Sequence, residues 1–262
     1  MMNFETIRVT TDESALATLT LARPEKHNAM SGQMIVEIAA AAELLAGDDT
    51  VRTVVLTGEG DSFCAGGDLS WMRAQAATAR PERIAEARKL AMALRALNEL
   101  PKPLIGRING QAFGGGLGLI SVCDVAVAVD TARFSFSEVK LGLVPATISP
   151  YVLSRMGEGY ARRVFMSGKL FDANEARDLG LISKVVPSSG LDEAIEAEVR
   201  PYRAASPQAV AAAKGLARRL GPIIDDAVID QTISLLANVW ETTDAAEGIA
   251  AFFDRRKPRW QA

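Results

Sequence analysis

The chain has 262 residues, of which 48% are hydrophobic and 23% charged, and its 29 basic and 32 acidic residues give a net charge of −3. This composition is that of a globular protein and excludes a disordered or fibrous chain. Because basic and acidic residues are interleaved, we expect no broad positive surface and no nucleic-acid partner.

Cysteine and histidine are too scarce to support metal or triad chemistry. Cys64 and Cys123 lack metal-ligand spacing, and His27 is the only histidine, so we expect neither metal catalysis nor a histidine-based triad. No apolar run is long enough to cross a membrane, and the acidic Glu5 stands where a signal peptide carries positive charge. We therefore expect a reduced, cytoplasmic location and no membrane partner.

The first half of the chain alternates predicted strands with predicted helices. Strands are expected over 4–10, 15–22, 53–58, 104–110, 125–129 and 133–136, and helices over 30–46 and 81–99. Helices placed between strands in this way indicate βαβ units with parallel pairing.

The pattern changes after about residue 149 and becomes mostly helical. Helices are expected over 161–167, 173–179, 191–204, 207–220, 225–240 and 244–253. We therefore predict an α/β core over residues 1–200 and a helical C-terminal region over 201–262, which serves in oligomerisation or as a lid. Such an extension often covers a neighbouring subunit, and the sequence does not separate this arrangement from one in which it covers its own core.

Two glycine-rich stretches carry the strongest functional signal. Residues 62–69 (SFCAGGDL) and 110–119 (GQAFGGGLGL) each precede an expected helix, and glycine lets the backbone turn closely against a ligand. Together they predict a two-part oxyanion hole, in which two backbone N–H groups polarise a thioester carbonyl. Either stretch alone would indicate only a tight strand-to-helix turn.

Glu138 follows a short predicted strand within the apolar segment 136–145. Partial desolvation should raise the pKa of its carboxyl toward neutrality, where the group can pass a proton in either direction. The alternative is a surface glutamate paired with Lys140. With both glycine turns present, we prefer Glu138 as the catalytic base.

These motifs resemble the crotonase family, also called the enoyl-CoA hydratase/isomerase superfamily. The resemblance runs from 23–30 through both glycine turns to 251–258. It implies an α/β, crotonase-like (ClpP/crotonase) spiral of ββα units with a helical C-terminal extension. It also implies that Gly67 and Gly115 supply the oxyanion N–H groups beside Glu138, with CoA as part of the substrate and no metal or redox cofactor.

The resemblance further implies which residues bind CoA and how the chain assembles. Residues along the CoA would be Arg23, Lys26, Ala65, Asp68 and Leu69, although Arg23 and Lys26 are equally compatible with solvated loop charge. Phe252, Phe253 and Lys257 are similar to a C-terminal segment that often contacts the CoA of an adjacent subunit. Members of the family are commonly homotrimers or dimers of trimers.

Gly118 departs from the two-glutamate hydratase pattern. Typical hydratases have a glutamate two residues after the glycine triplet, and Glu138 matches only the second glutamate of that pair. The segments 69–72, 113–119, 136–143 and 145–151 resemble bacterial methylglutaconyl-CoA hydratases of leucine breakdown, which also have glycine at the first position. Isohexenylglutaconyl-CoA hydratases are hard to separate by the same motifs.

The preferred function is therefore that of a lyase that reversibly hydrates a 2-enoyl-CoA, with 3-methylglutaconyl-CoA in leucine catabolism as the best substrate. Lys140 or Arg155 could hold the distal carboxylate of that substrate. The alternatives are an enoyl-CoA double-bond isomerase, as in fatty acid metabolism, and an acyl-CoA-binding protein that has lost catalysis.

Four other residues near the turns have structural interpretations. Trp71 and Met72 could line an acyl pocket, but packing is the more usual role of such side chains. Cys64 is expected to be buried and inert because no base is adjacent in sequence. We expect His27 at the surface or beside CoA.

Overall fold

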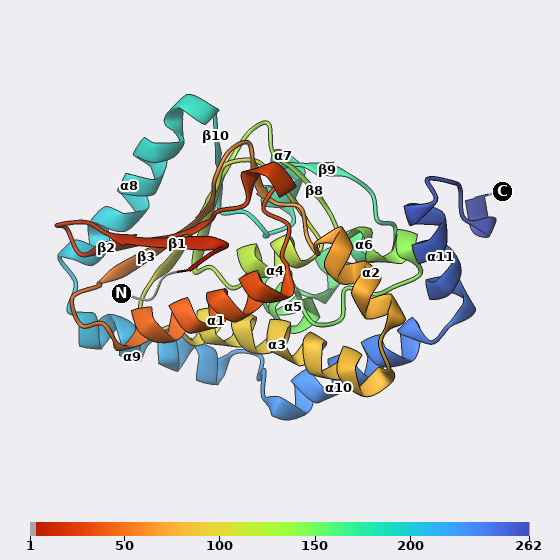
Figure 1. Cartoon of the computed structure of the whole chain (residues 1–262). Coiled ribbons are helices and arrows are strands. Elements are labelled where there is room, and N and C mark those ends of the chain that lie inside the picture. Colours follow the sequence, from red (N-terminus) through yellow and green to blue (C-terminus); the bar gives the residue numbers. More distant parts are fainter. Residues whose placement is uncertain (1–3, 262) are drawn as a thin grey trace.

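Two β-sheets form the centre of the molecule in the computed structural model, which describes residues 4–261 (Figure 1). The larger sheet has the strand order β1 (Ile7–Thr11), β2 (Leu16–Leu21), β3 (Thr53–Gly58), β5 (Leu104–Ile108), β7 (Val125–Val129) and β10 (Lys184–Val186). The smaller has the order β4 (Ser62–Cys64), β6 (Gln111–Phe113), β8 (Arg133–Ser135) and β9 (Phe171–Asp172). Only the β1–β2 and β8–β9 pairs are antiparallel.

From β3 to β8, successive strands alternate between the two sheets, which produces the spiral of ββα units that the resemblance implied. β3 leads to β4, β5 to β6 and β7 to β8, and each pair is followed by a helix or a turn: α2 (Leu69–Ala77), α4 (Gly115–Ser121) and the 3₁₀ turn η2 (Ser137–Leu141). Because β4, β6 and β8 are parallel neighbours, the segments that follow them meet at one edge of the smaller sheet. Both glycine turns and Glu138 therefore come together.

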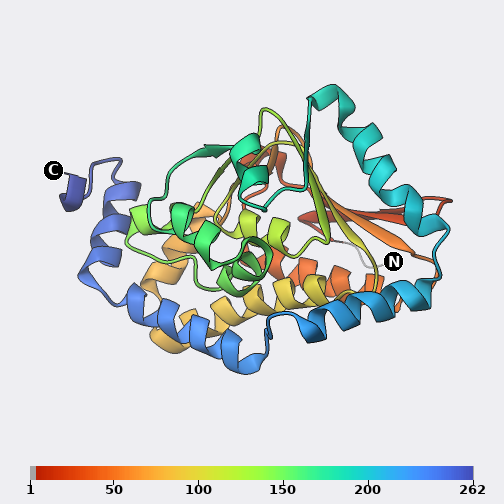
Figure 2. The same ribbon diagram turned by 180° about the vertical axis from the view of Figure 1, so that it is seen from behind.

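Helices cover the sheets, and most lie where the sequence predicts them. They are α1 (Gly32–Gly47), α3 (Arg80–Glu99), α5 (Ser149–Met156), α6 (Glu158–Phe165), α7 (Ala173–Asp178), α8 (Leu191–Arg203), α9 (Pro207–Leu220), α10 (Asp226–Trp240) and α11 (Thr243–Phe253). α1 packs on α3, and α3 packs on α10. α8 packs on β5 and β7 at the opposite end of the molecule from α11 (Figures 1 and 2).

The short strands β4 and β6 were not predicted. Each has three residues, too few for a recognisable period, and each leads into a glycine turn that dominates the local pattern. The strand predicted over 104–110 ends at Ile108. A Cβ atom on Gly110 would lie 2.0 Å from the carbonyl oxygen of Asp61, so the two chain segments touch backbone to backbone there.

The C-terminal helices lie against the same chain's α/β core. α9 and α10 follow one another along the side occupied by α1 and α3 (Figures 1 and 2), and α11 packs on η2. The predicted boundary at residue 200 falls inside α8; the division into two regions stays a prediction. Among residues 4–261, no helix combines the length and apolar character needed to cross a membrane.

Candidate functional site

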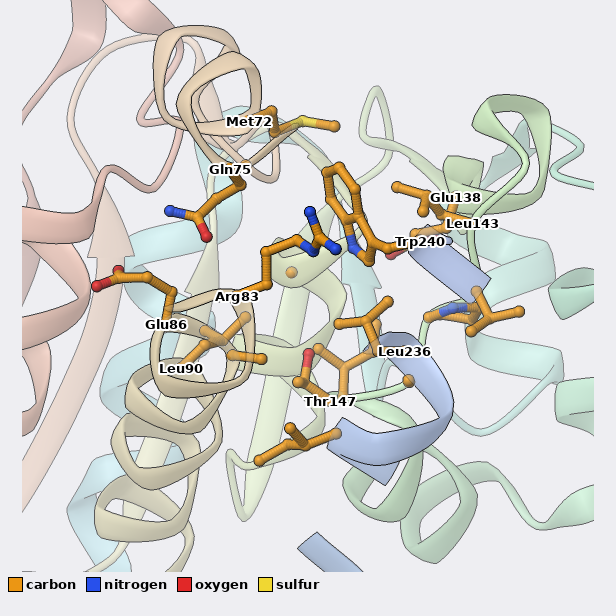
Figure 3. Close-up of a pocket in the computed structure, with 18 of the residues that line it drawn as sticks. Met72, Gln75, Arg83, Glu86, Leu90, Glu138, Leu143, Thr147, Leu236 and Trp240 are labelled. Atoms are coloured by element: carbon orange, nitrogen blue, oxygen red, sulfur yellow. The ribbon is translucent and has the colours of Figure 1, made fainter. Parts of the chain in front are cut away.

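A pocket with about 920 Å³ of empty space opens between the core and α10 (Figure 3). One wall comes from α2 and α3, the facing wall from α10, and the floor from both glycine turns, η2 and the segment 143–148. Most of its lining is apolar. The side chains that bring polar groups into it are Gln75, Arg83, Glu86, Glu138 and Thr147, together with the indole N–H groups of Trp71 and Trp240.

The first glycine turn is held by an isolated bridge between Met30 and Gly67. Met30 N–H donates to the carbonyl of Gly66 (2.7 Å), and Asp68 N–H donates to the carbonyl of Met30 (2.9 Å). This pattern skips the N–H of Gly67, which donates no hydrogen bond within residues 4–261. Gly67 lines the pocket, so its N–H is available to a ligand.

The second turn places Gly115 at the start of α4, where backbone N–H groups have no partner inside the helix. The preceding Gly114 has φ +47° and donates its N–H to the carbonyl of Ser135 (3.1 Å). Gly115 N–H itself has no acceptor in the described part of the chain. A Cβ at Gly115 would lie 2.2 Å from Met30 Cε, so a larger residue here would require the end of the Met30 side chain to move.

Glu138 reaches the same floor from η2. A Cβ atom on Gly114 would lie 3.0 Å from Glu138 Oε1, which places the carboxyl directly beside the second turn. Glu138 Oε2 is buried and has no hydrogen-bond partner. Burial raises the pKa of Glu138 to about 7. The alternative of a surface pair is wrong: Lys140 is exposed, and its stem lies against Gly168.

Gly118 leaves no room for a second catalytic carboxyl. A Cβ at this position would lie 2.5 Å from Cγ2 of Ile148 and 3.0 Å from its Cβ. The pocket does contain one other carboxylate, that of Glu86 on α3, which accepts a hydrogen bond from the Trp71 indole (3.4 Å) and pairs with Lys89. Figure 3 shows Glu86 on the side of the pocket away from Glu138.

Comparison with known proteins decides the family. The model of a family described as Enoyl-CoA hydratase/isomerase matches residues 11–262. The chain belongs to the enoyl-CoA hydratase/isomerase family.

Individual members of this family match almost from end to end. The 2,3-dehydroadipyl-CoA hydratase of Escherichia coli K12 is 35% identical over 244 residues, which is 92% of each chain. An enoyl-CoA hydratase structure from Shewanella pealeana superposes with a TM-score of 0.81 at 37% identity, covering 98% of this chain and 96% of that one. Pseudomonas aeruginosa AtuE gives 0.78 at 35% identity, covering 98% and 100%. These similarities confirm the predicted crotonase fold.

Arg23 and Asp68, both implied as CoA contacts, pair with each other. Their side chains are 3.0 Å apart, and Arg23 also donates to the carbonyl of Ala29 (2.8 Å). Asp68 caps α2 by accepting from the N–H groups of Ser70 and Trp71. Burial opposes ionisation of Asp68, but these N–H groups and Arg23 together hold its pKa below the usual range. The pair therefore stabilises the turn that carries Gly67.

The other residues implied to bind CoA lie outside the acyl pocket. Lys26 is exposed, Leu69 is exposed and Ala65 is half-buried. At the C-terminal end, Phe252 and Lys257 are exposed. The guanidinium of Arg73 lies 4.4 Å above the ring of Phe253, which joins α11 to α2 of the same chain.

The distal-carboxylate candidates from the sequence are corrected by the structure. Arg155 is half-buried and donates to the carbonyls of Leu181 and Cys123 (2.6 Å each), and neither it nor Lys140 lines the pocket. Arg83 is the arginine that does. The sequence analysis missed it because it lies among several charged residues on α3, a pattern typical of a solvated helix face.

The structure also places the four remaining residues. Trp71 and Met72 line the pocket, and Trp71 also packs against the core; that they contact an acyl group stays a prediction. Cys64 is buried as predicted, and burial raises the pKa of its thiol to about 12. His27 is exposed, with Nδ1 3.0 Å from the hydroxyl of Ser62.

Proposed function

We propose that this protein is a lyase that adds water reversibly to a 2-enoyl-CoA, with 3-methylglutaconyl-CoA as its substrate in leucine catabolism. The observation that carries the proposal is the meeting of three groups in one pocket: the unengaged N–H groups of Gly67 and Gly115 and the unpartnered carboxyl of Glu138. Membership of the family supports thioester chemistry. The name of the Escherichia coli relative contains an acyl group with a second carboxyl, which supports a dicarboxylic substrate.

In this mechanism the two N–H groups bind the thioester oxygen and stabilise the negative charge that forms on it. The ionised Glu138 orients a water molecule and takes one of its protons while the water oxygen bonds to C3. The electron pair of the C2–C3 double bond moves into the thioester enolate. Glu138 then returns the proton to C2, so one water is added and the carboxylate is regenerated.

The same proposal includes the CoA contacts and the assembly. Arg23, Lys26, Ala65, Asp68 and Leu69 would lie along the CoA, and Phe252 and Lys257 would contact that of an adjacent subunit in a homotrimer or dimer of trimers. Since Arg23 is already held by Asp68, Lys26 is the cation most free to meet a CoA phosphate.

The test is turnover of 3-methylglutaconyl-CoA, crotonyl-CoA and a 3-enoyl-CoA by the wild type and Glu138→Gln, with products identified by mass. Gln keeps the shape of the side chain and removes its base, so we expect hydration to fall about 100-fold or more. Glu43→Gln, on the exposed side of α1, is the matched control and should retain activity. Full activity in Glu138→Gln would overturn the assignment of the base.

Double-bond isomerisation is the second candidate, favoured by the absence of room for a carboxyl at Gly118. One carboxyl suffices to carry a proton between two carbons of an enolate, and no water is added. A mass-neutral conversion of the 3-enoyl-CoA would support it. Binding of every thioester without turnover would instead support a non-catalytic acyl-CoA-binding protein. Preferential hydration of the larger isohexenylglutaconyl-CoA would support an isohexenylglutaconyl-CoA hydratase.

A further inference from the structure

The pocket contains an unexplained concentration of unpartnered polar atoms. Within residues 4–261, four buried side-chain polar atoms have no hydrogen-bond partner: Arg52 Nε, Gln75 Oε1, Arg83 Nε and Glu138 Oε2. All but the first belong to residues that line this one pocket. Buried polar groups are normally paired because an unmade hydrogen bond is costly. Glu138 is explained by catalysis, whereas Gln75 and Arg83 are not.

Arg83 is anchored from behind and leaves one edge of its guanidinium unused. Nη1 donates to the carbonyl of Thr78 (2.6 Å), and Nη2 lies 3.7 Å from Glu241. Glu241 also pairs with Arg80 (2.8 Å), so its charge is shared between two arginines. Figure 3 shows the Arg83 side chain extending from α3 toward Trp240 of α10. Its free Nε–H is therefore a charged donor inside an apolar enclosure.

Gln75 supplies a second polar group from α2. The residue is only 8% exposed. The oxygen and nitrogen of its amide are interchangeable in assignment, so a rotation of the amide presents an N–H in place of the buried oxygen. Glu86, the other charge in this part of the pocket, is already paired with Lys89 and with the Trp71 indole. At this end of the pocket, the Arg83 Nε–H is therefore a charged donor that still lacks an acceptor.

We propose that Arg83 and Gln75 form the subsite for a carboxylate at the far end of the acyl group. A carboxylate offers several lone pairs to the Arg83 Nε–H and the Gln75 amide, and charge-assisted hydrogen bonds of this kind are the strong ones. An apolar acyl chain would leave the Arg83 Nε–H buried without an acceptor. The subsite selects thioesters of dicarboxylic acids, and this deepening rests on the proposed function.

Kinetics test the subsite through Arg83→Met, which keeps much of the length and removes the charge. We expect kcat/KM for 3-methylglutaconyl-CoA to fall about 10- to 100-fold, mainly through KM, while turnover of crotonyl-CoA changes less than about twofold. Arg83→Lys should recover part of the loss, and Gln75→Leu should reproduce a smaller one. Arg88→Met, on the same helix but outside the pocket, is the matched control.

A binding measurement tests the subsite independently of whether the protein hydrates its substrate. Calorimetric titration with the saturated thioesters glutaryl-CoA and butyryl-CoA requires no turnover. A preference for glutaryl-CoA that disappears in Arg83→Met supports the subsite even if hydration fails. Equal affinity of the wild type for both thioesters would overturn the subsite. So would an equal loss of affinity for both thioesters in Arg83→Met when its thermal unfolding is unchanged. A preference of the wild type for a neutral hydroxylated acyl group would also overturn it.

Discussion

Glu138 combines two properties at the scale of one residue: it is the only carboxyl among the described residues of the pocket floor, and the fold gives its buried oxygen no partner. A partner such as a lysine would favour the ionised form and lower the pKa. Without one, burial dominates and raises the pKa to about 7. The same burial that prepares the carboxyl for proton transfer therefore makes its ionised form costly to the folded state.

This cost predicts a pH-dependent stability difference between the wild type and Glu138→Gln. The pKa rises from 4.5 in the unfolded chain to about 7 in the folded one, so above pH 4.5 the unfolded state releases this proton while the folded state retains it. The folded wild type loses stability between pH 4.5 and 7, by up to about 3 kcal/mol. Glu138→Gln should therefore become the more stable protein as pH rises to 8.

Urea unfolding of both proteins at pH 5 and pH 8 measures this difference. The gain in Glu138→Gln should be small at pH 5 and large at pH 8, whereas Glu43→Gln, on an exposed helix face, should show no such change. An equal difference at the two pH values would mean that Glu138 does not titrate in this range.

Pocket residues could be predicted from the sequence where a strong local motif marks them, and not where their position depends on residues far away in the chain. The glycine turns and the apolar surroundings of Glu138 are visible within about ten residues of each. Arg83 becomes a pocket residue only because α10, about 150 positions later, packs across α3. No local pattern distinguishes it from the solvated charges beside it, and the position of Arg155 depends on the carbonyls of Leu181 and Cys123, 26 and 32 positions away.

At the scale of elements, close approach of neighbouring segments to the α4 backbone explains why α4 is so rich in glycine. Gly116 packs on Cys64 of β4, and Gly118 packs on Ile148, which precedes α5. Gly118 is therefore required for the contact between α4 and α5. Its position in the hydratase pattern suggested a missing catalytic acid, but its immediate role is to let two elements touch.

Gly118→Ala should consequently destabilise the protein by about 1–3 kcal/mol, since its Cβ would lie 2.5 Å from Ile148 Cγ2. Gly215→Ala is the matched control: it also lies within a helix, α9, and nothing stands within 4 Å of its added Cβ. That change should be neutral or stabilise by up to about 1 kcal/mol. Thermal unfolding compares the two, and Ile148→Ala should recover part of the loss. Equal behaviour of the two glycine variants would contradict the packing argument.

At the scale of the whole molecule, the order of elements was predictable because long, strongly periodic segments dominate it. The parallel pairing and nearly every helix of the C-terminal region follow from these periods. The sequence left open which core the C-terminal helices cover. In the structure α10 lines the pocket of its own chain and α11 packs on the η2 turn that carries Glu138. This choice depends on packing between remote segments, which local periodicity does not encode.

The exposed side of α9 and the segment that follows it lead to a prediction about assembly. Leu216 and Leu220 of α9 and the following Ile223 are 51%, 81% and 71% exposed, and large apolar side chains grouped in this way are typical of interaction surfaces.

If the chain forms a trimer or a dimer of trimers through this region, Leu220→Lys combined with Ile223→Lys should dissociate it, because a charge buried without a partner is strongly destabilising. Light scattering after size exclusion measures the mass directly. Leu44→Lys, at an exposed leucine of α1, should leave the assembly intact, whereas a monomeric wild type would show that these leucines serve no self-association.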